Sequence, residues 1–224
     1  MRHEIAKTIL FLLLITASFF TFADDLGSTD ITANRVGFIS AQITLIKIVI
    51  FLIGLIVLIS SIVKMKYVND ANQKSPFAAV VMGIFAATLM MNINASLSVF
   101  TKTFFDVDAV CMQIAEKKID DNCFKDEMSG LTGDIKSRVQ KLSNDQTAST
   151  FMTTFQLVIG IFQVIGLIYF AVGAYGLKEV ANGSSKDGGY GKPIITMIAA
   201  ALIVDIPHTA QMAIDTLHSV GLNF

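Results

Sequence analysis

The residues most able to do chemistry lie together near the C-terminus of the chain. They follow one another at intervals of three, three, four and three positions: Asp205, His208, Gln211, Asp215 and His218. That spacing places all five on one face of a helix. One interpretation is a metal or proton site, since Asp and His at positions i and i+3 can share a ligand. We favour the other, a polar stripe on an amphipathic helix at a membrane rim or against partner helices, because the ligand set is incomplete.

Elsewhere the sequence has no motif of a known catalytic centre. It lacks a phosphate-binding loop, a Gly-x-Ser-x-Gly elbow, a His-Glu-x-x-His helix and paired metal-binding cysteines. The glycine-rich segment 188–192 ends in a lysine but has neither the spacing of a phosphate loop nor a preceding strand. We therefore expect a protein that is not an enzyme and has no cofactor and no metal.

The composition indicates that lipid, and not water, surrounds most of the chain. Of the 224 residues, 53% are hydrophobic and only 16% are charged, whereas soluble domains carry about a quarter charged residues. The net charge is −1 and there is no tryptophan, so the basic surface and stacking platform of a nucleic-acid-binding protein are missing. The expected fold class is an all-α membrane protein.

The N-terminus has the pattern of a secretory signal sequence. Arg2 and Lys7 precede an apolar run over 9–20, and Thr21-Phe22-Ala23 is a small-x-small cleavage site before two aspartates. We expect a signal peptide over 1–23, cleaved after Ala23, and an exported lead-in over 24–42. An uncleaved signal anchor is the alternative.

Four apolar runs predict four transmembrane helices in two tandem hairpins. The first hairpin occupies 43–100, and the second occupies 151–224 together with an amphipathic C-terminus. A proline opens the second helix of each hairpin, where the first helical position tolerates it. Each hairpin turns through a short basic loop, and the lysines of the two loops are Lys64, Lys66 and Lys74, then Lys178, Lys186 and Lys192.

The two hairpins read as copies of one another. Residues 53–56 match residues 165–168 at an offset of 112, and the second helices match at an offset of 113. Chance likeness between apolar helices is the alternative, but matched polar positions are harder to obtain from hydrophobicity alone. We expect a parallel repeat whose second helices end in polar or packing residues within the membrane: Asn92 and Asn94, then Asp205, Pro207 and His208.

Local sequence also predicts details of these helices. Pro207 should kink or restart the last helix, because proline removes a backbone donor. The glycines of the third span, Gly160, Gly166, Gly173 and Gly176, are read as helix-packing positions in preference to hinges.

The basic loops determine the expected topology. The positive-inside rule places both loops in the cytoplasm, so the mature N-terminus, the C-terminus and segment 101–150 are periplasmic. This segment has helical patterning and holds the two cysteines, Cys111 and Cys123. An oxidising periplasm favours a disulfide between them, with two unpaired thiols as the alternative.

The C-terminal hairpin resembles a family of secretion proteins. Its Gly191-Lys192-Pro193 sequence, an Ala-rich run and then residues 202–207 (Leu-Ile-Val-Asp-Ile-Pro) are similar to the DotE/IcmC-like inner-membrane proteins of type IVB (Dot/Icm) secretion and their relatives in plasmid conjugation. Each hairpin is also similar to the two-helix pilins of type IV secretion. The first copy departs from the pattern, with Asn94 where the second has Pro207, and the cysteine segment has no counterpart in it.

This resemblance implies a non-enzymatic structural component of a secretion or conjugation apparatus in the bacterial inner membrane. The implied partners are other membrane subunits and the lipid bilayer, with further copies of the chain as a candidate and no direct contact with nucleic acid. A small transporter or channel subunit and a duplicated pilin-like subunit are the alternatives.

Overall fold

The computed structural model describes residues 31–68, 77–106, 110, 112, 114–115, 118–119, 145–184 and 189–221. The chain divides into two compact units, residues 1–34 and residues 35–224. The expected signal peptide and lead-in, Cys111, Cys123, Lys74 and Lys186 lie outside the described residues.

The described residues are almost entirely helical. The helices are α2 (Ile31–Met65), α3 (Phe77–Met91), α4 (Ile93–Phe105), α6 (Asp145–Ala181), α7 (Gly191–Val204) and α8 (Ile206–Ser219). Between α4 and α6, β1 (Ile114–Ala115) pairs antiparallel with β2 (Lys118–Ile119). Segment 101–150 was expected to be helical, and the part described consists of the end of α4, this strand pair and the first turns of α6.

Two of the helices are long and apolar enough to cross a membrane, over Arg35–Met65 and Thr154–Ala181. Two bent pairs add further apolar length: α3 meets α4 at 95°, and α7 meets α8 at 97°. If each bent pair is one span, the described chain has up to four. By length and composition this is therefore an all-α membrane protein.

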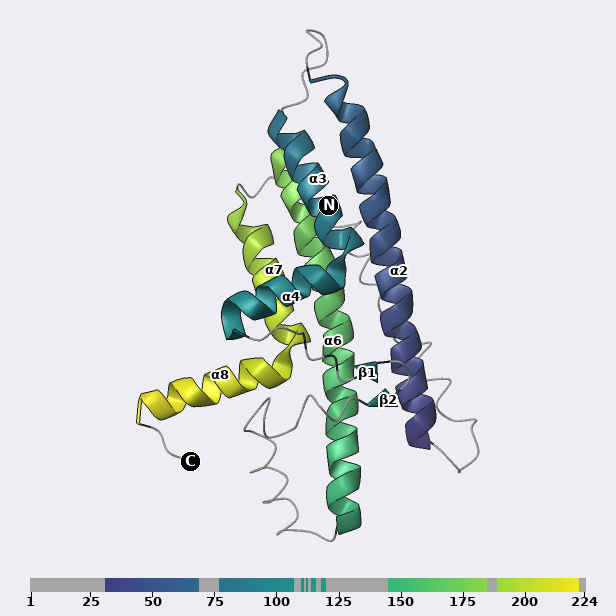
Figure 1. The fold of residues 1–224 in the computed structure, drawn as a ribbon, viewed down its shortest axis with the longest axis vertical. Coiled ribbons are helices and arrows are strands. Elements are labelled where there is room, and N and C mark those ends of the chain that lie inside the picture. The colour runs from purple at the N-terminus through teal and green to yellow at the C-terminus, as the bar shows by residue number, and fades with distance from the viewer. Residues whose placement is uncertain are drawn as a thin grey trace. The chain divides into compact units, whose positions relative to one another are not determined.

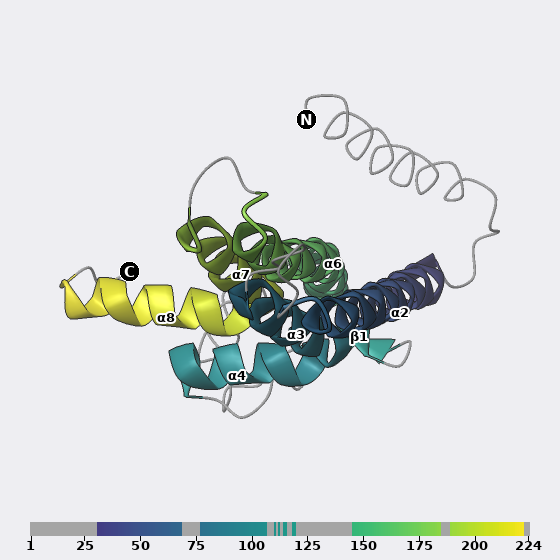
Figure 2. The same cartoon turned by 90° about the horizontal axis from the view of Figure 1, so that it is seen from above.

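α6 is the central helix of the bundle. α7 packs along it and α3 contacts it as well, while α2 runs beside α3 (Figure 1). α4 and α8 cross the direction of the long helices and extend toward the same side, as the view from above also shows (Figure 2). The residues buried most completely include Leu167, Phe170 and Val204, so the core follows the contact between α6 and α7.

Small residues allow the helices to approach closely. A Cβ atom added to Gly166 would lie 3.1 Å from the backbone nitrogen of Val204, and one added to Gly173 would lie 3.1 Å from that of Met197. Both atoms belong to α7, so the packing role expected for these two glycines is confirmed. In the first half, Gly54 of α2 has a similar position, with its added Cβ 3.1 Å from the backbone nitrogen of Met91.

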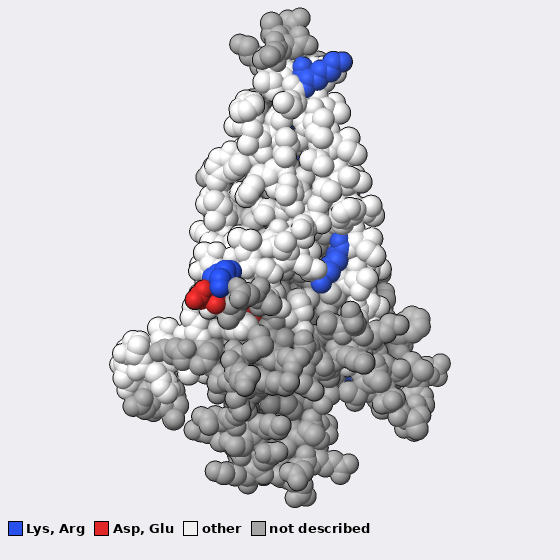
Figure 3. All heavy atoms as spheres, in the orientation of Figure 1, with Lys and Arg blue, Asp and Glu red and all other residues white. Residues whose placement is uncertain are grey.

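The outer surface of the long helices is apolar. In the most apolar part of α2 only 22% of the residues are buried, compared with 50% in α6. Exposed side chains on α2 form a stripe along the helix: Leu45, Ile48, Leu52, Ile56, Ile59 and Val63. Figure 3 shows how few charged side chains interrupt the described surface on one face. Such a surface suits contact with lipid.

The boundaries of several elements differ from expectation. α3 covers the apolar run 77–91 as predicted, but α2 begins at Ile31 and not at residue 43, because the polar residues before the span continue the helix. α6 likewise begins at Asp145, before the expected 151. The break that ends α3 was not predicted, since the first hairpin was read as continuous to residue 100.

The contact at Gly166 gives a test of this packing. We expect Gly166→Ala to lower the free energy of unfolding by about 1–3 kcal/mol, because the added methyl group meets α7 backbone atoms that cannot rotate away. Unfolding of the purified protein in detergent micelles, followed by helical circular dichroism during titration with sodium dodecyl sulfate, measures the change. Gly37→Ala is the matched control, because a Cβ there meets no described atom within 4 Å. Equal stability of the two variants would contradict the packing.

Candidate functional site

The candidate site is the second bend, where α7 gives way to α8. Asp205 ends α7 and precedes α8, with φ −110° and ψ 55°, so helical geometry is interrupted at this residue. Pro207 occupies the first turn of α8, where its missing N–H removes no helical hydrogen bond. The break expected from Pro207 is therefore present, and it is located at Asp205.

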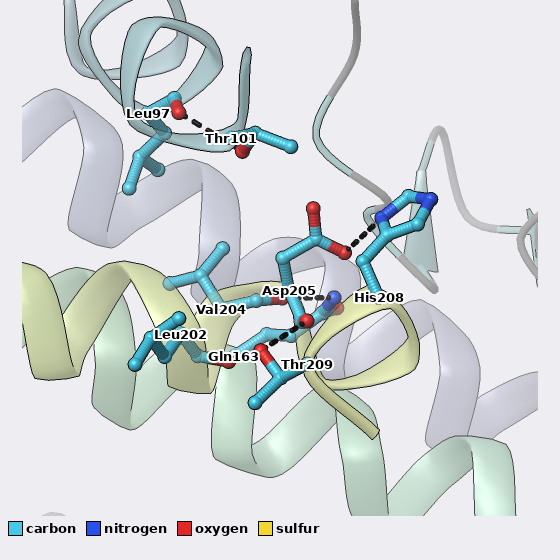
Figure 4. A network of polar contacts seen from close by, with 8 residues as sticks. All are labelled: Leu97, Thr101, Gln163, Leu202, Val204, Asp205, His208 and Thr209. Atoms are coloured by element: carbon cyan, nitrogen blue, oxygen red, sulfur yellow. Dashed lines mark hydrogen bonds and ion pairs between the residues drawn. The ribbon is translucent and has the colours of Figure 1, made fainter. Parts of the chain in front are cut away.

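The bend brings two of the predicted polar residues together. His208 Nδ1 lies 2.7 Å from Asp205 Oδ1, and both side chains are buried, Asp205 with 0% and His208 with 5% of its surface exposed (Figure 4). Asp205 Oδ2 and His208 Nε2 are buried with no hydrogen-bond partner among the described residues. The pair can hold a proton between its two members, and it leaves one acceptor and one ring nitrogen for another group.

The pair lies where the two halves of the chain meet. The ring of Phe105, the last residue of α4, has its centroid 5.9 Å from that of His208. α4 also contacts α7 and α8 directly. The Asp205–His208 pair therefore lies at the contact between the two bent helix pairs.

Side chains satisfy the carbonyl groups that the bend frees. Thr209 Oγ1 lies 2.8 Å from the carbonyl oxygen of Leu202, which the bend frees, and 2.8 Å from that of Asp205, which also accepts a hydrogen bond from the backbone N–H of Thr209. Gln163 Nε2 of α6 donates to the carbonyl oxygen of Val204 at 2.8 Å (Figure 4). The last carbonyls of a helix have no donor within it, so these contacts stabilise the break where it stands.

The first bend has a similar backbone conformation. Asn92 has φ −123° and ψ 60°, close to the angles of Asp205. Ser96 Oγ lies 3.0 Å from the carbonyl oxygens of both Leu89 and Asn92. These three positions lie 113 residues before Leu202, Asp205 and Thr209. The hydroxyl residues were missed from the sequence, although each follows its polar residue by four positions and that spacing was visible.

The two bends differ in the exposure of their polar side chains. Asn92 and Asn94 are exposed, and Asn92 makes no side-chain capping bond. Asp205, Pro207 and His208 are buried. The set expected as intramembrane polar positions therefore divides into a surface pair at the first bend and a buried group at the second.

Among the described side chains of the polar stripe expected over residues 205–218, the structure brings Asp205 and His208 together. His218 is exposed toward the end of α8, and the side chains of Gln211 and Asp215 lie outside the description. Within the described ranges no three His, Cys, Asp or Glu residues are grouped so that they could hold a metal ion.

Two of the described lysines expected in the basic loops, Lys64 and Lys178, lie near one another at the other end of the bundle. Lys64 Nζ donates to Asn182 Oδ1 at 2.9 Å, and Lys178 Nζ donates to Ser60 Oγ at 3.1 Å. These bonds join the C-terminal ends of α2 and α6, so the two long helices run parallel. Lys66 and Lys192 are exposed.

Comparisons with protein-family models, with curated proteins and with solved structures find no match to this chain.

The buried pair yields a double-mutant prediction. We expect His208→Leu to lower the free energy of unfolding by about 1–3 kcal/mol, because Asp205 is left buried without its hydrogen-bond partner. The double variant Asp205→Leu with His208→Leu should recover much of that loss, since no polar group is then stranded. Unfolding of each purified variant in detergent gives the coupling energy. Strictly additive losses would show that the contact has no energetic role.

Proposed function

We propose that this chain is a non-enzymatic structural subunit in the inner-membrane part of a type IV secretion or conjugation apparatus of the IVB-like kind. The observation that carries the proposal is α8, which leaves the bundle at 97° and exposes apolar side chains along an arm: Met212, Leu217 and Val220. Exposed apolar residues on a projecting helix are a common feature of surfaces that contact a neighbour. The arm starts at residues 202–207, on which the resemblance to DotE/IcmC-like proteins rests.

The proposed membrane arrangement has four spans in two tandem copies of one hairpin. The matched bends support the duplication, since the same angles and the same hydroxyl contacts recur 113 residues apart. The meeting of Lys64 and Lys178 at one end of the bundle supports a common cytoplasmic side for both loops. A cleaved signal peptide, periplasmic termini and a Cys111–Cys123 disulfide complete the proposal.

Reporter fusions test this topology. Alkaline phosphatase fused after Lys125 should be active, because the positive-inside rule places that segment in the periplasm, and a fusion after Lys186 should be inactive. Activity in colonies and cell extracts is the measurement, with immunoblots to match fusion levels. The opposite pattern would exclude the proposed orientation and, with it, the oxidising environment of the two cysteines.

Assembly is tested at the second bend. We expect Asp205→Leu to insert normally, because the helix becomes more apolar, but to lose partner subunits and transfer activity. The physical reason is that the Asp205–His208 contact fixes the first turn of α8 beside Phe105. Co-purification from native membranes followed by mass spectrometry, together with a conjugation or secretion assay, gives both readouts.

Asn92→Leu is the matched control at the first bend. Its effect should be milder, because Asn92 is exposed and a single amide bond between membrane helices contributes under about 1 kcal/mol. Normal assembly and transfer with Asp205→Leu would contradict the assembly role proposed for the second bend. A variant that keeps its partners but abolishes a solute or ion flux seen with the native protein in vesicles would favour the transporter alternative.

A further inference from the structure

A hollow lies beside the first bend, on the opposite half of the chain from the buried Asp205–His208 pair. It has a volume of about 310 Å³, is open on one side and is lined by α2 and the junction of α3 with α4. Its polar lining comes from Thr44, Lys47, Asn92 and Asn94, and its apolar lining comes from Ile48, Phe51, Met91 and Ile93. A smaller part of the wall can therefore form hydrogen bonds or attract charge, and the larger part suits hydrocarbon.

Lys47 supplies the charge in this hollow. It is partly buried on a helix long enough to cross a membrane. The ion pairs among the described residues join Lys102 to Asp106 and His208 to Asp205, so no acidic side chain described here pairs with Lys47. A cation that is partly removed from water without a counter-charge is costly, so Lys47 is suited to bind an anion that the described part of the chain does not supply.

A second source of positive potential faces the same hollow. α4 begins at Ile93, and Ile93 and Asn94 line the cavity. The first N–H groups of a helix are unpaired, and the helix dipole gives its N-terminus about half a positive charge. Asn92 at the start of α4 makes no side-chain capping bond and carries no charge to offset this potential.

The second bend has an acid at the corresponding position. There the residue before the helix is Asp205, which makes no side-chain capping bond but contacts His208 in the first turn of α8 through its carboxylate. The position 112 residues after Lys47 is the apolar Ile159, which is 3% exposed. One bend thus has its own acid and no lysine, while the other has a lysine and no acid.

The depth of Lys47 indicates where the anion comes from. Lys47 and Lys64 are separated by about 26 Å along α2 at about 1.5 Å per residue, close to the roughly 30 Å thickness of a bilayer's hydrocarbon core. Since Lys64 lies at one end of the bundle, the hollow lies near the opposite membrane boundary. The exposed apolar stripe on α2 begins beside it, with Leu45 61% and Ile48 55% exposed.

We propose that this hollow binds the phosphate group of an anionic phospholipid. Lys47, the N-terminus of α4 and the amides of Asn92 and Asn94 hold the phosphate, and Ile48, Phe51 and the stripe beyond them contact an acyl chain. A lipid has both the charge and the hydrocarbon that this lining suits. The proposal depends only on the membrane spans and goes beyond the assembly role proposed above.

Lipid retention tests the site. The native protein is placed in nanodiscs of phosphatidylethanolamine and phosphatidylglycerol, then released and analysed by native mass spectrometry. We expect it to retain bound phosphatidylglycerol, and Lys47→Gln to retain it about tenfold less, the loss of one charge-assisted hydrogen bond. Lys47→Arg should keep the lipid, because the positive charge remains. Lys102→Gln is the matched control, because the charge it removes is already paired with Asp106.

A second variant tests the comparison of the bends and does not alter the lysine. Asn92→Asp places a carboxylate where the second bend has Asp205, so phosphatidylglycerol retention should fall although Lys47 is intact. Retention equal to the native protein in Lys47→Gln or in Asn92→Asp would overturn the proposal. Loss of a partner subunit from the native membrane complex of Lys47→Gln, with lipid retention unchanged, would also overturn it. The anion beside Lys47 would then be a carboxylate of that partner.

Discussion

The structure depends on how backbone carbonyl groups are satisfied where a helix breaks in apolar surroundings. An unpaired carbonyl away from water is destabilising, because lipid tails have no hydrogen-bond donor to offer it. At each bend a hydroxyl in the first turn of the new helix donates to a carbonyl that the break frees in the preceding helix, Ser96 to Leu89 at the first and Thr209 to Leu202 at the second. At the second bend α6 adds Gln163. Because these carbonyls are satisfied locally, α4 can follow α3, and α8 can follow α7, at nearly a right angle without a long loop.

The same backbone geometry supports two different electrostatic arrangements. Asp205 places a carboxylate against the positive end of α8 and holds His208 beside it, so the second bend is closed and buried. Asn92 leaves the positive end of α4 without a charge of its own, beside the ammonium group of Lys47. Two bends of similar backbone conformation can differ in this way because the backbone contacts that shape them do not involve the side chains of Asn92 and Asp205.

Much of the fold follows from hydropathy, and most of the site does not. The run 77–91 after Pro76 predicted α3, and Pro207 predicted a break near its position, because proline has a strong local effect. The bend at Asn92 was missed, since asparagine disfavours a helix only weakly and the bend relies on Ser96 and on the close approach of Met91 to Gly54. The spacing of three residues predicted that Asp205 and His208 lie on the same helical face. Their burial beside Phe105 depends on a contact between distant segments of the chain, which spacing does not reveal.

The packing of α3 against α6 has a consequence for biosynthesis. α3 is made before α6, so its face toward α6 is uncovered until the later helix is in place, and the small buried residues of α3 include Ala79, Ala86 and Ala87. In water such a face would invite aggregation, but lipid solvates alanine and glycine without a hydrophobic penalty. Where the candidate spans of the first half insert into a bilayer, they can therefore remain there until α6, paired with α7, completes the bundle by lateral association.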